Sequence, residues 1–411
     1  MRIDLLTREF PPFVYGGAGV HVTELAKVLR KYAQVRVHAF DGARRAGRAV
    51  PDLPAGIDVC GYDCPQELAQ ANPALKTMGT DLLMAQCAAG ADIVHSHTWY
   101  ANFAGHLAGL LHGIPHVISA HSLEPLRPWK EEQLGGGYRV SSWIEKAAYE
   151  NAAGIVAVSR AMKDDILRCY PSLDPKSVRV IHNGIDLDTW KAPQTDSARE
   201  QAENFFRSYG LDPRRPTVIF VGRITRQKGV PWLLRALRKV DPGVQVILCA
   251  GAADTPRIAQ ETRELVARLK AVRKGVVWIE DNLTQPQILA LEVCSTVFVT
   301  PSVYEPLGIV NLEAMGAGLP VVGTATGGIP DCIEHEKTGL LVPIEQLNDG
   351  TGTPLNPEKF ESDLAAALNR LCTDRDLARE YGAAGRKRVE KYFSWSAIAV
   401  KTMDFYRSIL G

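Results

Sequence analysis

The sequence lacks a charge excess, a paired-cysteine motif and a long apolar run, and each absence excludes a class of protein. The 411 residues carry 47 Lys and Arg against 46 Asp and Glu, which gives no electrostatic basis for binding nucleic acid or an anionic membrane. The eight cysteines form no Cys-x-x-Cys pair, so zinc is not expected and most thiols are expected in the core. No apolar run approaches the roughly 20 residues of a membrane helix.

The opening segment MRIDLLTREFPP also lacks the apolar stretch of a secretory signal. Together with the scattered cysteines, this predicts a reduced, cytoplasmic protein. The composition, 46% hydrophobic and 23% charged, is typical of a soluble globular chain, and the length predicts about two or three domains.

Short β-branched runs alternate with helical patterns, which indicates parallel βαβ units. In the first half, strands are expected at 3–6, 35–40, 92–97, 115–121 and 154–159. In the second half, they are expected at 217–222, 244–251, 275–280, 296–301 and 320–324. We therefore predict an α/β fold with two Rossmann-like, doubly wound domains that face a central cleft, with ligands at the carboxyl ends of the strands.

A polar, proline-bounded segment at 195–216 separates the two strand series and places the join between the domains somewhere near 185–215. We predict domains at 1–195 and 196–392. The strands should be buried on both faces, since their apolar character is continuous rather than alternating.

The first candidate site is the glycine-rich stretch VYGGAGVH (14–21), which follows the first strand and opens a helix. Its glycines are Gly16, Gly17 and Gly19. They let a ligand approach the backbone near a helix N-terminus, although a purely structural turn would use them as well. The dinucleotide fingerprint is incomplete because its third glycine position falls on Val22. Asp41 nevertheless lies at the ribose-reading distance, which keeps a dinucleotide-dependent oxidoreductase open.

The second candidate site is the basic loop VGRITRQKG (221–229), which carries Arg223, Arg226 and Lys228. Three cations at a helix N-terminus oppose the helix dipole unless an anion binds there. A diphosphate fits this loop because each oxygen can accept charge-assisted hydrogen bonds. Solvated surface charge is the alternative, and the spacing is not that of a P-loop.

The third candidate site is YEPLGIVNLEAMGAG (304–318), with two carboxylates. Pro306 disfavours helix at Glu305, so Glu305 is expected on a loop, while the helix begins near Gly308–Ile309 and contains Glu313. The two carboxylates suit sugar or ribose hydroxyls, and the N–H groups of residues 308–310 suit phosphate. A glycoside hydrolase that uses both carboxylates is an alternative, as is a structural role.

Several histidines follow predicted strands, namely His95, His97, His121 and His182. A lone histidine is more often structural than ligand-binding. We therefore select only His121 as a ligand-contacting residue. The Asp-x-Asp at 186–188 follows a turn pair, so turn chemistry is favoured and a metal site is rejected.

The motifs of interest are distributed along most of the chain, and they are VYGGAGVH, SAHSL, VSRAMKDDIL, VIHNGID, VGRITRQKG, YEPLGIVNLEAMGAGLPVV and TGGIPDCI. Together they resemble the retaining glycosyltransferases of the two-Rossmann-domain (GT-B) type, in the glycogen-synthase-like family. Within it, REFPPFVYGGAGVHVTEL is similar to short actinobacterial enzymes that use ADP-glucose.

The resemblance implies a hexosyltransferase with an acceptor domain at 1–195, a nucleotide-sugar donor domain at 196–392 and a final helix at 393–411 that crosses back to the first domain. Glucose would pass from ADP-glucose to glucose 1-phosphate or to an α-1,4-glucan, in maltose-1-phosphate or glycogen synthesis. A UDP- or GDP-sugar with another acceptor stays open. No cofactor, metal, nucleic acid or membrane partner is expected, and a homodimer is expected on family grounds.

The resemblance also implies the roles of particular residues. Arg223 and Lys228 would hold the diphosphate, and Glu305 would accept hydrogen bonds from the transferred sugar. Glu313 would bind the ribose, and His121 would contact the sugar near the reacting carbon. The remaining donor-side residues are Gly16, Gly17, Gly19, Gly308, Ile309 and Val310.

One departure from the family concerns the acceptor. Many bacterial glycogen synthases carry Lys-x-Gly-Gly in the first loop, whereas this chain has Val14 at the lysine position. This favours a phosphorylated acceptor as a hypothesis, drawn also from the basic segment LRPWKEEQLGGGYR. The candidate acceptor residues are Arg8, Tyr15, Arg127, Lys130 and Arg139. A non-catalytic sugar-nucleotide-binding regulator is a further alternative class.

Overall fold

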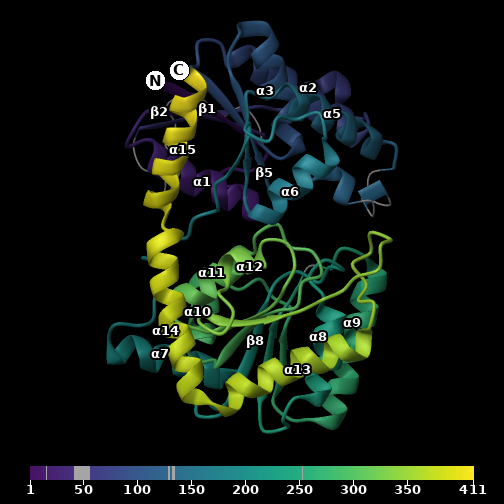
Figure 1. Ribbon diagram of the computed structural model, residues 1–411, viewed down its shortest axis with the longest axis vertical. Coiled ribbons are helices and arrows are strands. Elements are labelled where there is room, and N and C mark those ends of the chain that lie inside the picture. Colours follow the sequence, from purple (N-terminus) through teal and green to yellow (C-terminus); the bar gives the residue numbers. More distant parts are fainter. Residues whose placement is uncertain (15, 41–55, 128–129, 132–134, 252) are drawn as a thin grey trace. The chain divides into compact units, whose positions relative to one another are not determined.

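The apolar runs form two parallel sheets, one in each half of the chain. The computed structural model describes residues 1–14, 16–40, 56–127, 130–131, 135–251 and 253–411. These residues form two units, one of residues 1–184 with 395–411 and the other of residues 185–394 (Figure 1). Each unit is a doubly wound α/β domain, which confirms the predicted fold class.

The first unit has a seven-stranded sheet in the order β3-β2-β1-β4-β5-β6-β7. Its strands are β1 (Arg2–Thr7), β2 (Gln34–Ala39), β3 (Ile57–Gly61), β4 (Ile93–His97), β5 (His116–Ala120), β6 (Gly154–Ala157) and β7 (Val178–Val180). Its helices are α1 (Gly17–Leu29), α2 (Pro73–Cys87), α3 (Trp99–His112), α5 (Gly137–Asn151), α6 (Arg160–Cys169) and α15 (Trp395–Leu410), with 3₁₀ turns η1 (Gln66–Leu68) and η2 (Glu124–Leu126).

The second unit has a six-stranded sheet in the order β10-β9-β8-β11-β12-β13. Its strands are β8 (Thr217–Val221), β9 (Gln245–Cys249), β10 (Val276–Ile279), β11 (Val297–Thr300), β12 (Val321–Thr324) and β13 (Gly339–Val342). Its helices are α7 (Asp196–Ser208), α8 (Val230–Ala236), α9 (Pro256–Val272), α10 (Gln285–Val293), α11 (Ile309–Gly316), α12 (Ile329–Cys332), α13 (Pro357–Thr373) and α14 (Arg375–Tyr392), with the 3₁₀ turn η4 (Leu237–Lys239).

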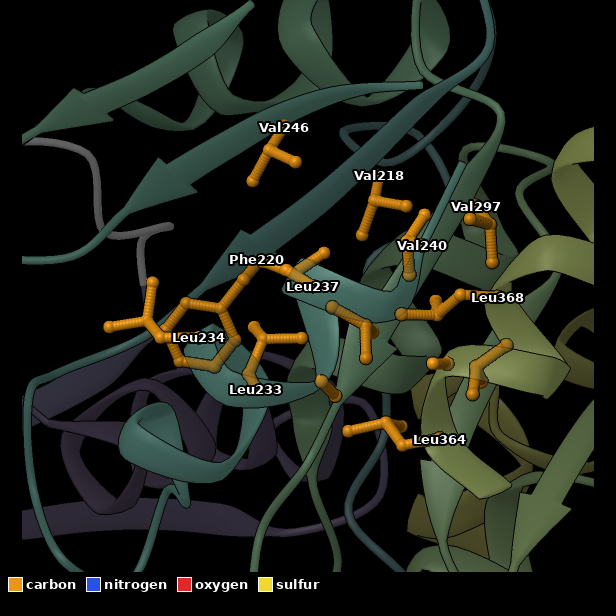
Figure 2. Packing of buried hydrophobic residues seen from close by; sticks show 14 of the residues in the cluster. Val218, Phe220, Leu233, Leu234, Leu237, Val240, Val246, Val297, Leu364 and Leu368 are labelled. Atoms are coloured by element: carbon orange, nitrogen blue, oxygen red, sulfur yellow. The ribbon is translucent and has the colours of Figure 1, made fainter. Parts of the chain in front are cut away.

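The central strands of both sheets are buried on both faces, as their continuous apolar runs predicted. In β1, Leu5 packs in a cluster with residues of α1 and α15, while the next residue, Leu6, packs in a cluster with residues of α2 and α3. In the second unit, Phe220 and Val218 of β8 face Leu233 and Leu237 beside residues of α13 (Figure 2). These two-sided cores hold the strand ends, and therefore the loops that follow them, in fixed positions.

The boundary between the units falls at 184/185 and 394/395, rather than at the predicted 195/196 and 392/393. The segment from 185 belongs to the second unit because Ile185 N donates to Phe393 O at 2.8 Å and Arg386 Nη1 donates to Trp190 O at 2.5 Å. Helix α15 belongs to the first unit, where Tyr406 OH lies 2.6 Å from His95 Nδ1. Among the described helices, none is long and apolar enough to cross a membrane.

Candidate functional site

Two loops of the second unit lie side by side because β8 and β11 are neighbours in its sheet. Val303 N, after β11, donates to Gln227 O, after β8, at 2.9 Å. Gly229 is essential to this approach, since its φ is +66° and an added Cβ would lie 1.9 Å from the carbonyl oxygen of Pro301. The basic loop and the loop that carries Glu305 therefore pack against each other at the carboxyl edge of the sheet.

An ion pair joins the two loops. Lys228 Nζ donates to Glu305 Oε2 at 2.7 Å, and Ser302 Oγ donates to the same oxygen at 3.1 Å. Both side chains are largely buried, with exposed fractions of 20% for Lys228 and 8% for Glu305. Lys228, which was predicted to bind phosphate, thus contacts Glu305, which was predicted to accept hydrogen bonds from the sugar. Each side chain fixes the position of the other.

Helix α11 starts where the sequence predicted it, with Gly308 as the cap residue and Ile309 as its first residue. Gly308 has a φ of +89°, and an added Cβ would lie 2.5 Å from Asn311 Nδ2. The N–H groups of Ile309 and Val310 lie in the first turn, where an α-helix leaves its amides without intrahelical acceptors. This helix end can hold an anion beside Glu305.

Glu313 lies in the second turn of α11, apart from the Glu305 loop, as predicted. Burial raises the pKa of Glu313 to about 7, and the nearby Lys228 acts in the opposite direction. Pro306 places the two carboxylates on different elements, and the raised pKa makes the charge of Glu313 change near neutral pH.

Arg223 lies at the outer end of the same edge and is exposed. Its Nη1 lies 3.2 Å from Asp254 Oδ1, on the segment after β9. A cavity of about 210 Å³ opens beside this loop at the ends of β8, β9 and β10. It is lined by Ile224, Gly251, Ala253, Ala259, Arg263, Trp278 and Glu280. The arrangement offers a mostly apolar pocket for a flat ring next to cations that suit phosphate.

The glycine stretch of the first unit surrounds a carboxylate of the chain itself. Gly16 N donates to Glu9 Oε2 at 2.8 Å, and an added Cβ at Gly19 would lie 2.7 Å from Glu9 Cβ. Gly19 is therefore required by the packing of Glu9, whatever ligand binds nearby. Helix α1 begins at Gly17, and its cap residue, Gly16, has no side chain to bond the first amides of the helix. Tyr15 and Asp41 lie outside the described residues.

His121 follows β5 and lies among other histidines. Its Nε2 is 3.1 Å from His97 Nδ1, and its ring centroid is 4.7 Å from that of His21. Burial lowers the pKa of His121 to about 4, so its ring is neutral at physiological pH. A neutral imidazole can donate or accept a hydrogen bond with a sugar hydroxyl but cannot neutralise a phosphate.

The candidate acceptor cations differ in their surroundings. Arg8 lies over the ring of Tyr100, with its Cζ 4.1 Å from the ring centroid, and Arg127 Nη1 donates to Ser122 Oγ at 3.2 Å. Lys130 is buried, and its Nζ donates to Glu124 Oε1 at 2.7 Å. Arg139 is exposed on α5. Lys130 thus has a structural partner that the sequence did not indicate, which makes Arg8 and Arg127 the better anchors.

Comparisons with known proteins decide the family. Residues 15–189 match the model of Glycosyltransferase Family 4, and residues 215–374 match that of Glycosyl transferases group 1. The chain is 50% identical over 409 residues to alpha-maltose-1-phosphate synthase of Mycobacterium tuberculosis, covering 100% of both chains. The same activity is named for a relative from Mycolicibacterium smegmatis, 50% identical over 411 residues with 100% of both chains covered.

The chain belongs to the GT-B glycosyltransferases. Solved structures agree on the fold: sucrose-phosphate synthase from Thermosynechococcus elongatus superposes with a TM-score of 0.78 at 23% identity, over 99% of this chain and 98% of the other. The catalytic domain of Starch Synthase IV from Arabidopsis thaliana, bound to ADP and acarbose, gives 0.72 at 20% identity, over 99% of each chain.

As a glycosyltransferase, the chain is a hexosyltransferase enzyme rather than a dinucleotide-dependent oxidoreductase, a glycoside hydrolase or a non-catalytic regulator. The family membership therefore decides among the alternatives that the residue patterns left open. Family membership also agrees with the arrangement of the two carboxylates of the YEPLGIVNLEAMGAG stretch. They lie on separate elements, and Glu305 is paired with Lys228.

The candidate site contains residues that sequence patterns did not single out. Ser302 supports Glu305, Asp254 holds Arg223, and Glu9 organises the glycine stretch. Ser302 and Glu9 lie next to recognised motifs, whereas Asp254 comes from the segment after β9, and nothing in the local spacing reveals the partner of any of them. A search for buried polar residues flanking each motif would have found Ser302, since it follows the predicted strand directly.

Proposed function

We propose that this glycosyltransferase moves glucose from ADP-glucose to glucose 1-phosphate with retention of the anomeric configuration, forming maltose 1-phosphate. The full-length identity of 50% to enzymes of that name carries the proposal. Extension of an α-1,4-glucan is the second candidate, supported by the weaker match, 25% identical over 439 residues, to glycogen synthase of Mycobacterium tuberculosis.

On the donor side, the proposal assigns the nucleoside to the cavity near Trp278 and the diphosphate to Arg223, Lys228 and the start of α11. The bond from the glucose C1 to the phosphate oxygen breaks, and negative charge grows on the departing diphosphate. Cations and helix N–H groups aimed at that charge lower the barrier. Glu305 holds the sugar hydroxyls, because its position is fixed by Lys228 and Ser302.

Retention requires the acceptor hydroxyl to enter on the face from which the diphosphate leaves. The departing phosphate oxygen then takes the proton of that hydroxyl as the new C1–O bond forms. No residue need act as nucleophile in this scheme, which agrees with the ion-paired state of Glu305. His121, neutral because burial lowers its pKa, is assigned to a sugar hydroxyl near C1.

On the acceptor side, the proposal assigns the phosphate of glucose 1-phosphate to Arg8 and Arg127. Guanidinium groups bind phosphate with two parallel hydrogen bonds, which gives direction as well as affinity. Lys130 lies near both: its pKa is lowered by burial and then by Arg127, while Glu124 acts against these effects. Lys130 is therefore assigned to support of the site.

The test is a donor and acceptor matrix. ADP-, UDP- and GDP-glucose are each combined with glucose 1-phosphate, glycogen and no acceptor, and nucleotide release and products are measured. We expect fast ADP release only with glucose 1-phosphate, and an α-configured product by NMR. If only the glucan is extended, the phosphate acceptor is wrong. If another nucleotide is released faster, the donor is wrong.

The reaction is proposed to need neither metal nor cofactor. Treatment of the enzyme with a chelator should not lower turnover, whereas loss of turnover restored by a divalent cation would contradict this. The homodimer expected from the family is likewise a proposal, which sedimentation of the full chain checks.

A further inference from the structure

Three histidine rings converge in the first unit at the carboxyl edge of its sheet. His21 comes from α1, His97 ends β4, and His121 follows β5. Each offers one ring nitrogen, and these nitrogens all lie within 4.8 Å of one another. The ring centroids are 4.7 to 5.4 Å apart, so the three rings border a common point rather than a line.

The hydrogen bonding of this cluster is incomplete. Nε2 of His97 is buried without a hydrogen-bond partner among the described residues, and the ring nitrogens of His21 meet no partner in hydrogen-bond geometry, with only the Asn183 side chain beside them. The neighbouring His95 is different, since its Nδ1 lies 2.6 Å from Tyr406 OH and its Nε2 lies 2.9 Å from Ser119 Oγ. A buried polar atom without a partner is costly, so the contrast with His95 points to a missing ligand at the cluster.

We propose that His21, His97 and His121 bind one divalent transition-metal ion, with Zn²⁺ as the best fit. Imidazole nitrogens suit zinc and its neighbours, whereas Mg²⁺ and Ca²⁺ need oxygen ligands that this cluster does not supply. The proposed metal site does not depend on the glycosyl transfer, for which we propose no metal.

The distances are close to those of a zinc site. Zn–N bonds of about 2.0–2.1 Å in a tetrahedron place ligand nitrogens about 3.3 Å apart. His97 Nδ1 and His121 Nε2 are already 3.1 Å apart. With the longest separation in the cluster at 4.8 Å, the remaining nitrogens need to approach by at most about 1.5 Å, which ring rotation supplies. Three protein ligands leave the fourth position open.

Binding needs a proton to move within the cluster but not to leave it. The N–H shared between His97 and His121 shifts to the other nitrogen of its own ring, and both rings stay neutral. Asn183 lies beside His21, and its buried Oδ1 has no hydrogen-bond partner among the described residues. It can accept the remaining N–H of His21, which is how outer groups commonly orient a metal-bound imidazole.

The ion would inhibit the enzyme, and this consequence rests on the proposed function. His121 is assigned there to a sugar hydroxyl, and an ion on its ring removes that hydrogen bond. The open fourth position would also attract a phosphate or hydroxyl oxygen and hold it away from its productive place. The site would therefore make transfer sensitive to free zinc.

Metal binding to the chelator-treated full chain tests the site directly. Co²⁺ is titrated with visible absorption, and Zn²⁺ with calorimetry. We expect one tight ion with the intense bands of a tetrahedral cobalt site, and at least tenfold weaker binding in His21→Asn and His97→Asn. His335→Ala removes an exposed histidine of the second unit and is expected to bind as the unchanged protein does. Circular dichroism confirms that each variant folds.

Three outcomes would overturn the site: unchanged affinity in both cluster variants, weaker binding in the His335 control, or a thiolate charge-transfer band that assigns the ion to cysteines. In the activity arm, added Zn²⁺ should lower turnover and chelator should restore it. If the ion binds while turnover is unaffected, the inhibitory role is wrong. An enzyme inactive with every donor would instead refute the proposed function and leave the cobalt titration valid.

Discussion

The two units present candidate sites at the same edge of similar sheets, yet they handle charge in opposite ways. In the second unit the site is ionised, with Lys228 paired to Glu305 across two loops. In the first unit the histidines of the site are kept neutral by burial, and the candidate cations Arg8 and Lys130 lie against an aromatic ring and Glu124. The difference suits a charged diphosphate in the second unit and sugar hydroxyls in the first.

Replacing Lys228 should have the largest effect, because the ion pair serves both binding and structure. In Lys228→Ala we expect turnover to fall about 10²–10³-fold, as in other sites that lose a group stabilising transition-state charge. Glu305 would be left as a buried, unpaired carboxylate, so stability should fall by about 3–5 kcal/mol. Steady-state kinetics and urea unfolding measure the two losses.

The double variant Lys228→Ala with Glu305→Gln separates these effects. Removing the orphaned charge should restore most of the stability without restoring turnover. Recovery of neither quantity would show that the pair is not the coupling between the loops. Near-normal turnover in the single variant would remove the diphosphate assignment.

In the first unit, Lys130 and Arg127 test whether structural support and substrate binding are carried by different cations. Lys130 and Glu124 are buried with exposed fractions of 7% and 0%, so Lys130→Ala should cost about 3–5 kcal/mol of stability. Arg127→Ala should instead raise the KM for glucose 1-phosphate and leave stability nearly unchanged. If Lys130→Ala folds normally and only the acceptor KM rises, Lys130 is an anchor after all.

Most of the fold was predictable because the central strands of both sheets are buried on both faces. All ten predicted strands are present, each within a few residues of its expected bounds. The three strands that the sequence did not reveal, β3, β7 and β13, lie at sheet edges. An edge strand has a neighbour on one side only and can be short or half-buried, as the three-residue β7 and the wholly half-buried β3 are. Its apolar signal is correspondingly weak.

The candidate sites were predictable as positions but not as contacts. Parallel topology places whatever follows a strand at the carboxyl edge, which is why Glu305, Lys228 and His121 lie where expected. The partners come from distant segments: Lys228 and Glu305 are 77 residues apart. Local spacing carries no record of such pairs.

A substitution at Gly19, in the glycine stretch of the first unit, should have a smaller effect on stability. An added Cβ would lie 2.7 Å from Glu9 Cβ and 2.8 Å from Glu9 Oε2. We expect Gly19→Ala to cost about 1–3 kcal/mol through overpacking. Thermal unfolding measures the loss, and Gly136→Ala, where an added Cβ meets nothing within 4 Å, is the matched control. Equal stability of the two variants would show that Glu9 does not require Gly19.

The smallest expected effect is the pH dependence of donor binding. Glu313 has its pKa raised to about 7, and its carboxyl must be ionised to accept hydrogen bonds from both ribose hydroxyls. Donor affinity should therefore be full above about pH 8 and fall as pH drops through 7, with the donor KM about tenfold higher at pH 6. His121, with a pKa of about 4, stays neutral throughout this range.

Glu313→Gln removes the titrating group, so its donor KM should be nearly constant between pH 6 and 8 and a few-fold above the unchanged enzyme at pH 8. The stability of the folded enzyme should change with pH in the direction opposite to donor affinity. A raised folded-state pKa favours the protonated form, so Glu313 costs stability as pH rises through 7, and the variant should be at least as stable as the unchanged enzyme at pH 8. A donor KM that keeps its pH dependence in Glu313→Gln would assign the titration to another group and leave Glu313 without its ribose role.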